Sequence, residues 1–85
     1  MSWRIGIARD AKKELAGLPV QTQTRIARAI LALESDPFPR GGKKLKNCDG
    51  WRIRVGDYRI LYVADTQARQ ITIGVIGHRR EVYRD

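Results

Sequence analysis

The sequence contains little cysteine and little histidine. One residue of each occurs among the 85 residues, so neither an internal disulfide nor a zinc site of ordinary composition can be assembled. Cys48 is followed by Asp49 and Gly50, and we expect it to lie in a loop as a reduced thiol of a cytoplasmic protein. The sequence therefore predicts no zinc site of this kind, and we expect no cofactor.

Long hydrophobic runs are missing as well. The longest apolar stretches, at residues 30–33 and 71–77, are far shorter than the ~20 residues that a helix needs to cross a bilayer. Near the start of the chain Trp3, Ile5 and Ile7 alternate with polar or small residues, and no cleavage-site pattern follows. The sequence thus predicts neither a membrane span nor a secretory signal.

Acidic residues are outnumbered. Lys and Arg number 17 against 9 Asp and Glu, which gives a net charge of +8 and a pI near 10.4. The hydrophobic fraction of 42% is ordinary for a folded protein, and we expect a single domain over residues 1–85 with one modest core. Such a surplus of positive charge predicts a polyanionic partner: nucleic acid first, and an acidic protein second. The two partners are compatible.

Two helices are predicted in the first half of the chain. Asp10 is the expected N-cap of a short first helix. Pro19 marks a break and can open a second helix over about residues 20–35, which the prolines at 37 and 39 stop. Apolar residues at helical spacing form the expected buried stripes: Ala11, Leu15 and Leu18 in the first helix, and Ile26, Ile30 and Leu33 in the second.

Strands are predicted on both sides of the helix pair. A half-buried strand is predicted at residues 1–8, a hairpin at residues 51–63, and a last strand at residues 70–77. Residues 40–50 are predicted to form a basic loop, with Leu45 pointing inward. The expected fold is an α+β domain of order β-α-α-β-β-β. In it, the N-terminal helix pair packs on one face of an antiparallel sheet of about four strands.

The hairpin is the most informative segment. Gly56 and Asp57 suit a type II′ turn, which pairs Val55 with Tyr58 and Arg54 with Arg59. One face then carries apolar and aromatic residues suited to a core: Trp51, Ile53, Val55, Tyr58, Ile60 and Tyr62. The other face carries Arg52, Arg54 and Arg59.

Two arginines directly opposite each other weaken a sheet, by an amount on the order of a few tenths of a kcal/mol up to about 1. An acid or a threonine at position 54 or 59 would avoid this cost. The arrangement therefore indicates an anion that comes from outside the chain. The alternative is a solvated face on which Arg52, Arg54 and Arg59 extend away from one another.

Three segments carry a family resemblance: Lys44-Leu45-Lys46, the hairpin at 51–62, and the run Ile-Gly-His-Arg-Arg-Glu-Val-Tyr at 76–83. In this order and at this length, the chain resembles the RelE toxin family within the RelE/ParE superfamily of bacterial toxin–antitoxin systems. The resemblance covers essentially the whole chain. It implies a toxin that enters the ribosomal A site and cleaves mRNA through the RNA's own 2′-hydroxyl, without a metal ion. It also implies an antitoxin that wraps the toxin and blocks its basic face.

The resemblance also assigns site residues. Arg59 corresponds to the family's phosphate-binding arginine, Arg79 to the arginine after the last strand, and Tyr83 to the C-terminal tyrosine. Arg52 and Arg54 stand where RelE members often carry lysines. Since an arginine does not lose its proton in the accessible range, a lysine's acid–base role does not transfer to position 54.

The expected chemistry is attack of a 2′-oxygen on phosphorus. Arg59 with Arg54 or Arg79 could clamp the phosphate, because guanidinium groups match its charge and geometry. Tyr83 and His78 are the two candidates for proton transfer. Tyr83 is favoured, because alternation along the last strand puts His78 on the face opposite Arg79. A tyrosine that only packs its ring and a histidine that only caps backbone groups remain alternatives.

Further basic residues are expected to contact RNA backbone, unless they are merely solvated: Arg40, Lys43, Lys44, Lys46 and Arg80. Two rival functions stay open. One is a ParE-like toxin, which shares the fold, poisons DNA gyrase and lacks the RNA-cleaving residues. The other is a non-catalytic module that binds RNA or the ribosome, which would need the arginines but not Tyr83.

Overall fold

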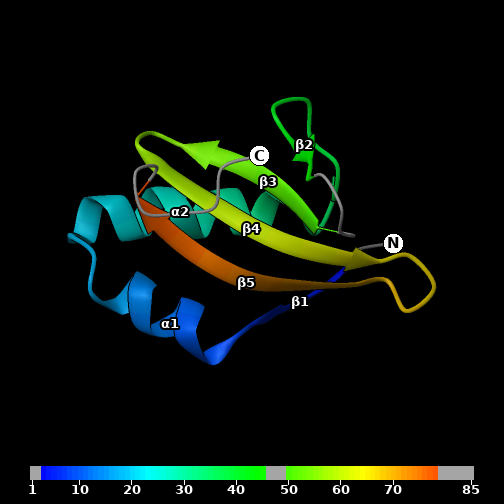
Figure 1. Ribbon diagram of the computed structural model, residues 1–85, viewed down its shortest axis with the longest axis horizontal. Helices are drawn as coiled ribbons and strands as arrows, with labels where there is room; N and C mark the ends of the chain where they lie inside the picture. The colour runs from blue at the N-terminus through cyan, green and yellow to red at the C-terminus, as the bar shows by residue number, and fades with distance from the viewer. Residues whose placement is uncertain (1–2, 46–49, 79–85) are drawn as a thin grey trace.

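The computed structural model describes residues 3–45 and 50–78. Two helices and five strands follow one another in this part of the chain (Figure 1). They are β1 (Arg4–Ile7), α1 (Arg9–Ala16), α2 (Val20–Ala32), β2 (Lys43–Lys44), β3 (Gly50–Val55), β4 (Tyr58–Asp65) and β5 (Gln70–His78). The predicted order of one strand, two helices and a final group of strands is confirmed.

The strands form one sheet in the order β1-β5-β4-β3-β2. Two details of the predicted sheet are wrong. It has five strands rather than about four, because Lys43 and Lys44 of the expected loop pair with Arg52 and Trp51. It is also mixed rather than antiparallel, since β1 runs parallel to β5. A two-residue strand has no alternation to detect, and a parallel neighbour far along the chain leaves no local signal.

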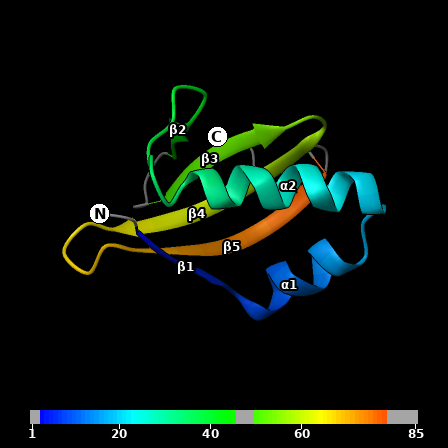
Figure 2. The ribbon, with the colours of Figure 1, turned by 180° about the vertical axis from the view of Figure 1, so that it is seen from behind.

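Both helices cover the same face of the sheet. Figure 2 shows α2 in front of the strands, and Figure 1 shows it behind them. Helix α1 lies beside the β5 edge of the sheet, and its buried Ala11 belongs to the same core cluster. The core lies between these layers, and its fully buried members come from both: Ala11, Ile26, Leu33, Ile60, Tyr62, Ile71, Ile73 and Ile76. In the described part of the chain, neither helix is long and apolar enough to cross a membrane.

The helix ends differ slightly from those expected. Asp10 is not the N-cap of α1: Ala8 takes that position, without a side-chain bond, and Asp10 lies in the first turn. Its carboxylate still complements the positive end of the helix dipole there. Pro19 precedes α2 as its N-cap, and the helix ends at Ala32, three residues before the predicted end. Turn hydrogen bonds continue the coil beyond that point to Asp36.

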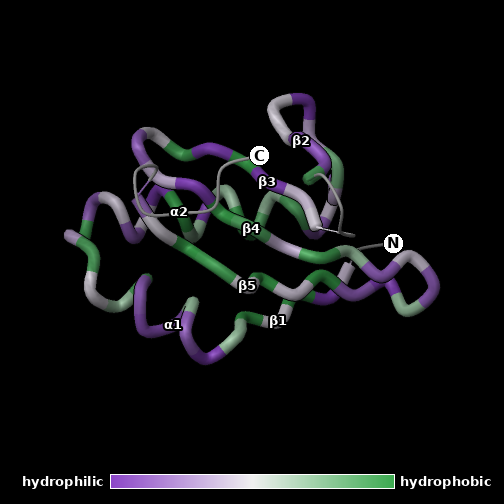
Figure 3. The backbone as a smooth tube through the Cα atoms, viewed as in Figure 1, coloured by the Kyte–Doolittle hydropathy of each residue, from purple (hydrophilic) through white to green (hydrophobic). Residues whose placement is uncertain are grey.

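The hairpin has the predicted register. Val55 pairs with Tyr58 and Arg54 with Arg59. Gly56 has a φ of 60°, whereas Asp57 is not among the described residues with positive φ, as a type II′ turn requires. Along β3, hydrophilic and hydrophobic residues alternate (Figure 3), which is the pattern that separates a core face from an outer face.

A bulge changes the alternation in β5. Leu61 pairs with Val75 and Tyr62 with Ile73, so Gly74 is the extra residue between them. The residues of β5 after the bulge therefore exchange faces: Ile76 points into the core and Val75 does not. Figure 3 shows a mostly pale or green β5, whose hydrophobic run hides this exchange.

Candidate nucleic-acid interface

Arg54 and Arg59 lie side by side on the face of the sheet that the helices leave open. They are direct partners across β3 and β4, and Gly77 of β5 continues the same row. Since Val55 and Tyr58 close a two-residue turn, they form the hydrogen-bonded pair, and Arg54 and Arg59 form the next, non-hydrogen-bonded pair. In such a pair the Cα atoms are only about 4.5 Å apart and the side chains approach most closely. Gly77 adds no side chain to this row.

The three hairpin arginines differ in exposure. Arg54 is exposed and Arg59 is half-buried, but Arg52 is only 8% exposed. Arg52 lies on the same face as Arg54 and Arg59, as predicted, but it is buried there rather than exposed to solvent. The Nε atoms of Arg52 and Arg59 are both shielded from solvent, so the sheet holds the base of each guanidinium group. Arg54 is the most accessible of the three.

The basic segment before the hairpin is partly ordered by the sheet. Arg40, Lys43 and Lys44 are all exposed, as expected for contacts to an external anion. The pairing of Lys43 with Arg52 puts Lys43 on the arginine face, whereas Lys44 is paired with Trp51 of the core face. Sequence reasoning missed this difference between two adjacent lysines, because it read both as loop residues. Leu45 is buried, as predicted.

His78 lies on the other face of the sheet. It pairs directly with Tyr58, and the two rings make an edge-to-face contact with centroids 5.6 Å apart. Tyr58 in turn packs against the core on the helix side. The structure therefore does not bring His78 to the face that carries Arg54 and Arg59.

Several predicted site residues lie outside the described residues. These are Arg79, Arg80, Tyr83 and Lys46. Their assignments stay predictions from the resemblance. Of the remaining candidates, Lys43, Arg52, Arg54 and Arg59 share the face that the helices leave open.

The arginine face also carries apolar side chains that the sequence did not single out. Val63 and Val75 are 49% and 41% exposed, and Val75 lies opposite Leu61 on this face. Val75 reaches it because of the bulge at Gly74. This end of the face therefore offers apolar contact next to the cationic end.

The arrangement suits phosphate recognition. Two guanidinium groups at neighbouring positions can each direct paired N–H donors at one phosphate. Tyr62, the tyrosine of the adjacent core, has no role here: its O–H donates to the carbonyl oxygen of Pro37 at 2.6 Å. Burial, with a contribution from the Asp36 carboxylate, raises the pKa of Tyr62 to about 12. Within residues 3–45 and 50–78, no three His, Cys, Asp or Glu side chains group in a way that could hold a metal ion.

Known proteins resemble this chain over nearly its whole length. The family model described as the ParE toxin of the type II toxin–antitoxin system parDE matches residues 5–83. A protein of Methanocaldococcus jannaschii named as a RelE1 toxin is 29% identical over 89 residues, which span 100% of this chain and 99% of that protein.

Solved structures show the same likeness. The archaeal RelE–RelB complex from Pyrococcus horikoshii OT3 matches with a TM-score of 0.86 and 30% identity, over 96% of this chain and 100% of that one. The RelB–RelE antitoxin–toxin complex from Methanococcus jannaschii matches with a TM-score of 0.75 and 26% identity, over 92% of this chain and 94% of that one. The chain therefore belongs to the ParE toxin family of type II toxin–antitoxin systems, within the RelE/ParE superfamily.

Proposed function

We propose that this toxin is an endoribonuclease that cleaves mRNA in the ribosomal A site. The observation that carries the proposal is the pairing of Arg54 with Arg59 on the face of the sheet opposite α1 and α2. Arg54 forms no ion pair within the described part of the chain. The net charge of +8 means that the protein has fewer acidic side chains than basic ones. In the proposed complex an RNA phosphate pairs with Arg54.

The proposed reaction uses the substrate's own nucleophile. The 2′-oxygen forms a bond to the adjacent phosphorus, the bond from phosphorus to the 5′-oxygen breaks, and a 2′,3′-cyclic phosphate and a 5′-hydroxyl result. Charge builds on the non-bridging phosphate oxygens in the transition state, where Arg59 and Arg54 stabilise it. We assign the proton transfers to Tyr83, because His78 contacts Tyr58 on the opposite face from these arginines.

The ribosome is part of the proposed mechanism. A site with two fixed cations and no strong base is slow on free RNA. Positioning the 2′-oxygen in line with the leaving 5′-oxygen lowers the barrier without any further protein group, and such orientation can contribute several kcal/mol. The ribosome would supply this positioning, with Arg40, Lys43 and Lys44 contacting RNA backbone.

We further propose that an antitoxin holds this toxin inactive. The relatives from Pyrococcus horikoshii and Methanococcus jannaschii were both solved as complexes of RelE with RelB. The chain has 17 basic and 9 acidic residues. This excess of positive charge favours an acidic partner that covers the arginine face.

Gyrase poisoning is the second candidate, because the matching family model is that of ParE. If the protein is an endoribonuclease, new mRNA 5′ ends should form when the pure protein is incubated with programmed ribosomes. No cleavage complex should form when it is incubated with gyrase and supercoiled DNA. Tyr83→Phe separates catalysis from binding: it should remove cleavage and leave ribosome binding intact. A toxin that traps gyrase and leaves mRNA whole would establish the second candidate instead.

A further inference from the structure

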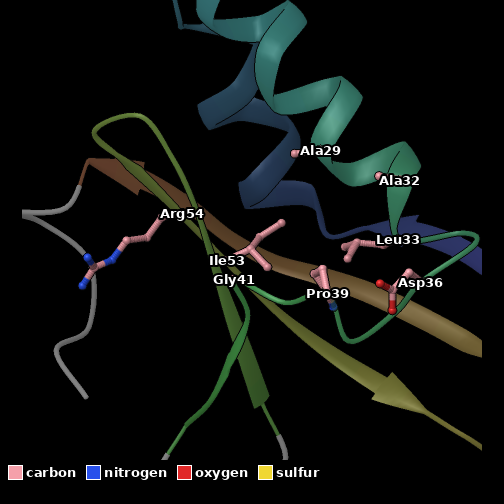
Figure 4. Close-up of a pocket in the computed structure, with 8 residues that line it drawn as sticks. All are labelled: Ala29, Ala32, Leu33, Asp36, Pro39, Gly41, Ile53 and Arg54. Carbon is pink, nitrogen blue, oxygen red and sulfur yellow. The ribbon is translucent and has the colours of Figure 1, made fainter.

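A cavity of about 380 Å³ lies between the C-terminal half of α2 and strand β3. Its lining is mostly aliphatic and comes from three segments: Ala29, Ala32 and Leu33 of α2 and its cap, Pro39 and Gly41 of the following loop, and Ile53 of β3. Asp36 and Arg54 complete the wall (Figure 4). Because two alanines supply the helix side, the cavity has room for one apolar side chain of a partner.

Arg54 connects this cavity with the arginine face. In Figure 4 its guanidinium group points away from α2, while Ile53, its neighbour in β3, points toward the helix. A ligand that crosses β3 at this point can therefore touch both. It would place an apolar group in the cavity and a negative charge on Arg54.

Within residues 3–45 and 50–78, no strand pairs with the edge of β3 where such a ligand would cross. In the described residues β2 pairs only with Trp51 and Arg52, so the strand continues beyond β2 from Ile53 to Val55. The alternation that follows from the Val55–Tyr58 pair directs the backbone N–H and C=O of Arg54 outward. An exposed strand edge beside a side-chain pocket is a way in which proteins recognise extended peptides.

The chemistry of the cavity favours a peptide over RNA. Among the described residues that line the cavity, none is aromatic and could stack on a base, and most are aliphatic. An aliphatic side chain gains free energy from leaving water at roughly 25 cal/mol per Å² of buried apolar surface. A carboxylate beside it in the sequence would pair with Arg54.

We infer that an extended acidic segment of the antitoxin places an apolar side chain in the cavity between α2 and β3 and a carboxylate on Arg54. The inference rests on the proposed function. It adds how inhibition works: the segment occupies the same guanidinium group that would bind the RNA phosphate. Antitoxin and mRNA then compete for Arg54, while the cavity belongs to the antitoxin alone.

The test fills the cavity without touching the arginines. Ala32→Leu adds bulk at the exposed last residue of α2, and Ala16→Leu is its matched control at the exposed last residue of α1. The probe is the purified product of the reading frame adjacent to that of this chain. Its affinity for each toxin variant is measured by titration, and mRNA cleavage on programmed ribosomes is measured in parallel. Thermal unfolding confirms that each variant is folded.

We expect Ala32→Leu to weaken the complex at least tenfold, Ala16→Leu to change it less than twofold, and both to cleave mRNA like the wild type. In the wild-type toxin, the NMR signals of the Ala29 and Ala32 methyl groups should shift when the probe binds and stay in place when a single-stranded RNA binds. Unchanged affinity of Ala32→Leu together with unshifted methyl signals would overturn the inference and leave the proposed function standing. Impaired cleavage with unchanged affinity would assign the cavity to RNA, which also overturns it. Absence of mRNA cleavage by every protein, including the wild type, would refute the proposed function. A tenfold loss of affinity of Ala32→Leu for the probe would still support the inference in that case.

Discussion

Arg54 and Arg59 face each other across β3 and β4 as a non-hydrogen-bonded pair on the face of the sheet opposite α1 and α2. Like charges in this position oppose folding, and the Nε atom of Arg59 is shielded from solvent in the folded protein. The sheet thus holds two cations close together in advance of any ligand. Preorganised charge of this kind favours a transition state, because the protein need not rearrange when negative charge develops.

Replacing Arg54 by threonine tests this trade between stability and function. Threonine suits a strand and removes the like-charge contact, so we expect Arg54→Thr to raise the free energy of unfolding by a few tenths of a kcal/mol up to about 1. Cleavage of mRNA should fall. Urea unfolding and a ribosome cleavage assay measure the two effects. A variant that is less stable than the wild type would show that Arg54 supports the fold.

Arg52 is predicted to act through packing. It is 8% exposed and lies beside Leu61 of β4 and Lys43 of β2. Arg52→Ala removes a buried aliphatic stem and should lower the free energy of unfolding by about 1–3 kcal/mol. Arg54→Ala, at an exposed position of the same strand, is the control and should not lower it. Equal stabilities of the two variants in urea would contradict the assignment.

Gly56 sets the hairpin turn. Its φ of 60° is unfavourable for any residue with a Cβ, and a Cβ there would also lie 3.4 Å from the Arg25 guanidinium nitrogens. We expect Gly56→Ala to destabilise the fold by about 1 kcal/mol or more. Gly41→Ala is the matched control, because a Cβ at Gly41 meets nothing within 4 Å and no positive φ is found there. Thermal unfolding of both variants decides the point.

Tyr62 should make stability depend on pH in the alkaline range. Burial first, and the Asp36 carboxylate second, raise its pKa from 10.0 to about 12. Because the folded pKa lies above the unfolded one, the folded state disfavours the phenolate. The contribution of Tyr62 is complete below pH 10 and is lost as the pH rises toward 12.

The variant Tyr62→Phe isolates this effect. It removes the hydrogen bond to the Pro37 carbonyl and should lower the free energy of unfolding by about 1 kcal/mol at neutral pH. The difference between wild type and variant should shrink above pH 10, since only the wild type can lose that proton. A constant difference from pH 7 to pH 11.5 would contradict titration of the buried Tyr62 hydroxyl as the cause of the alkaline loss.

Much of the hairpin could be predicted because its information is local. The Gly56 turn fixes the register, and the register fixes that Arg54 faces Arg59. The buried stripes of the helices follow in the same way from spacing, as Ile26 and Ile30 show.

The remaining features depend on contacts between distant segments. β1 lies beside β5 only because the helix pair carries the chain across the sheet, and Lys43 becomes a strand residue only because Arg52 pairs with it. The burial of Arg52 and the cavity beside Ala32 likewise arise from packing that no periodicity encodes. Gly74 could have been suspected, since a glycine within a β-branched run often marks a bulge.

The most direct test of the central claim is the rate of mRNA cleavage on programmed ribosomes by the wild type, Arg59→Ala and Arg28→Ala. Arg28 is an exposed arginine of α2, so its variant has the same change in net charge. We predict that Arg59→Ala lowers the rate at least 100-fold while it remains folded, and that Arg28→Ala cleaves within twofold of the wild type. Equal rates for the two variants would contradict phosphate binding by the arginine face.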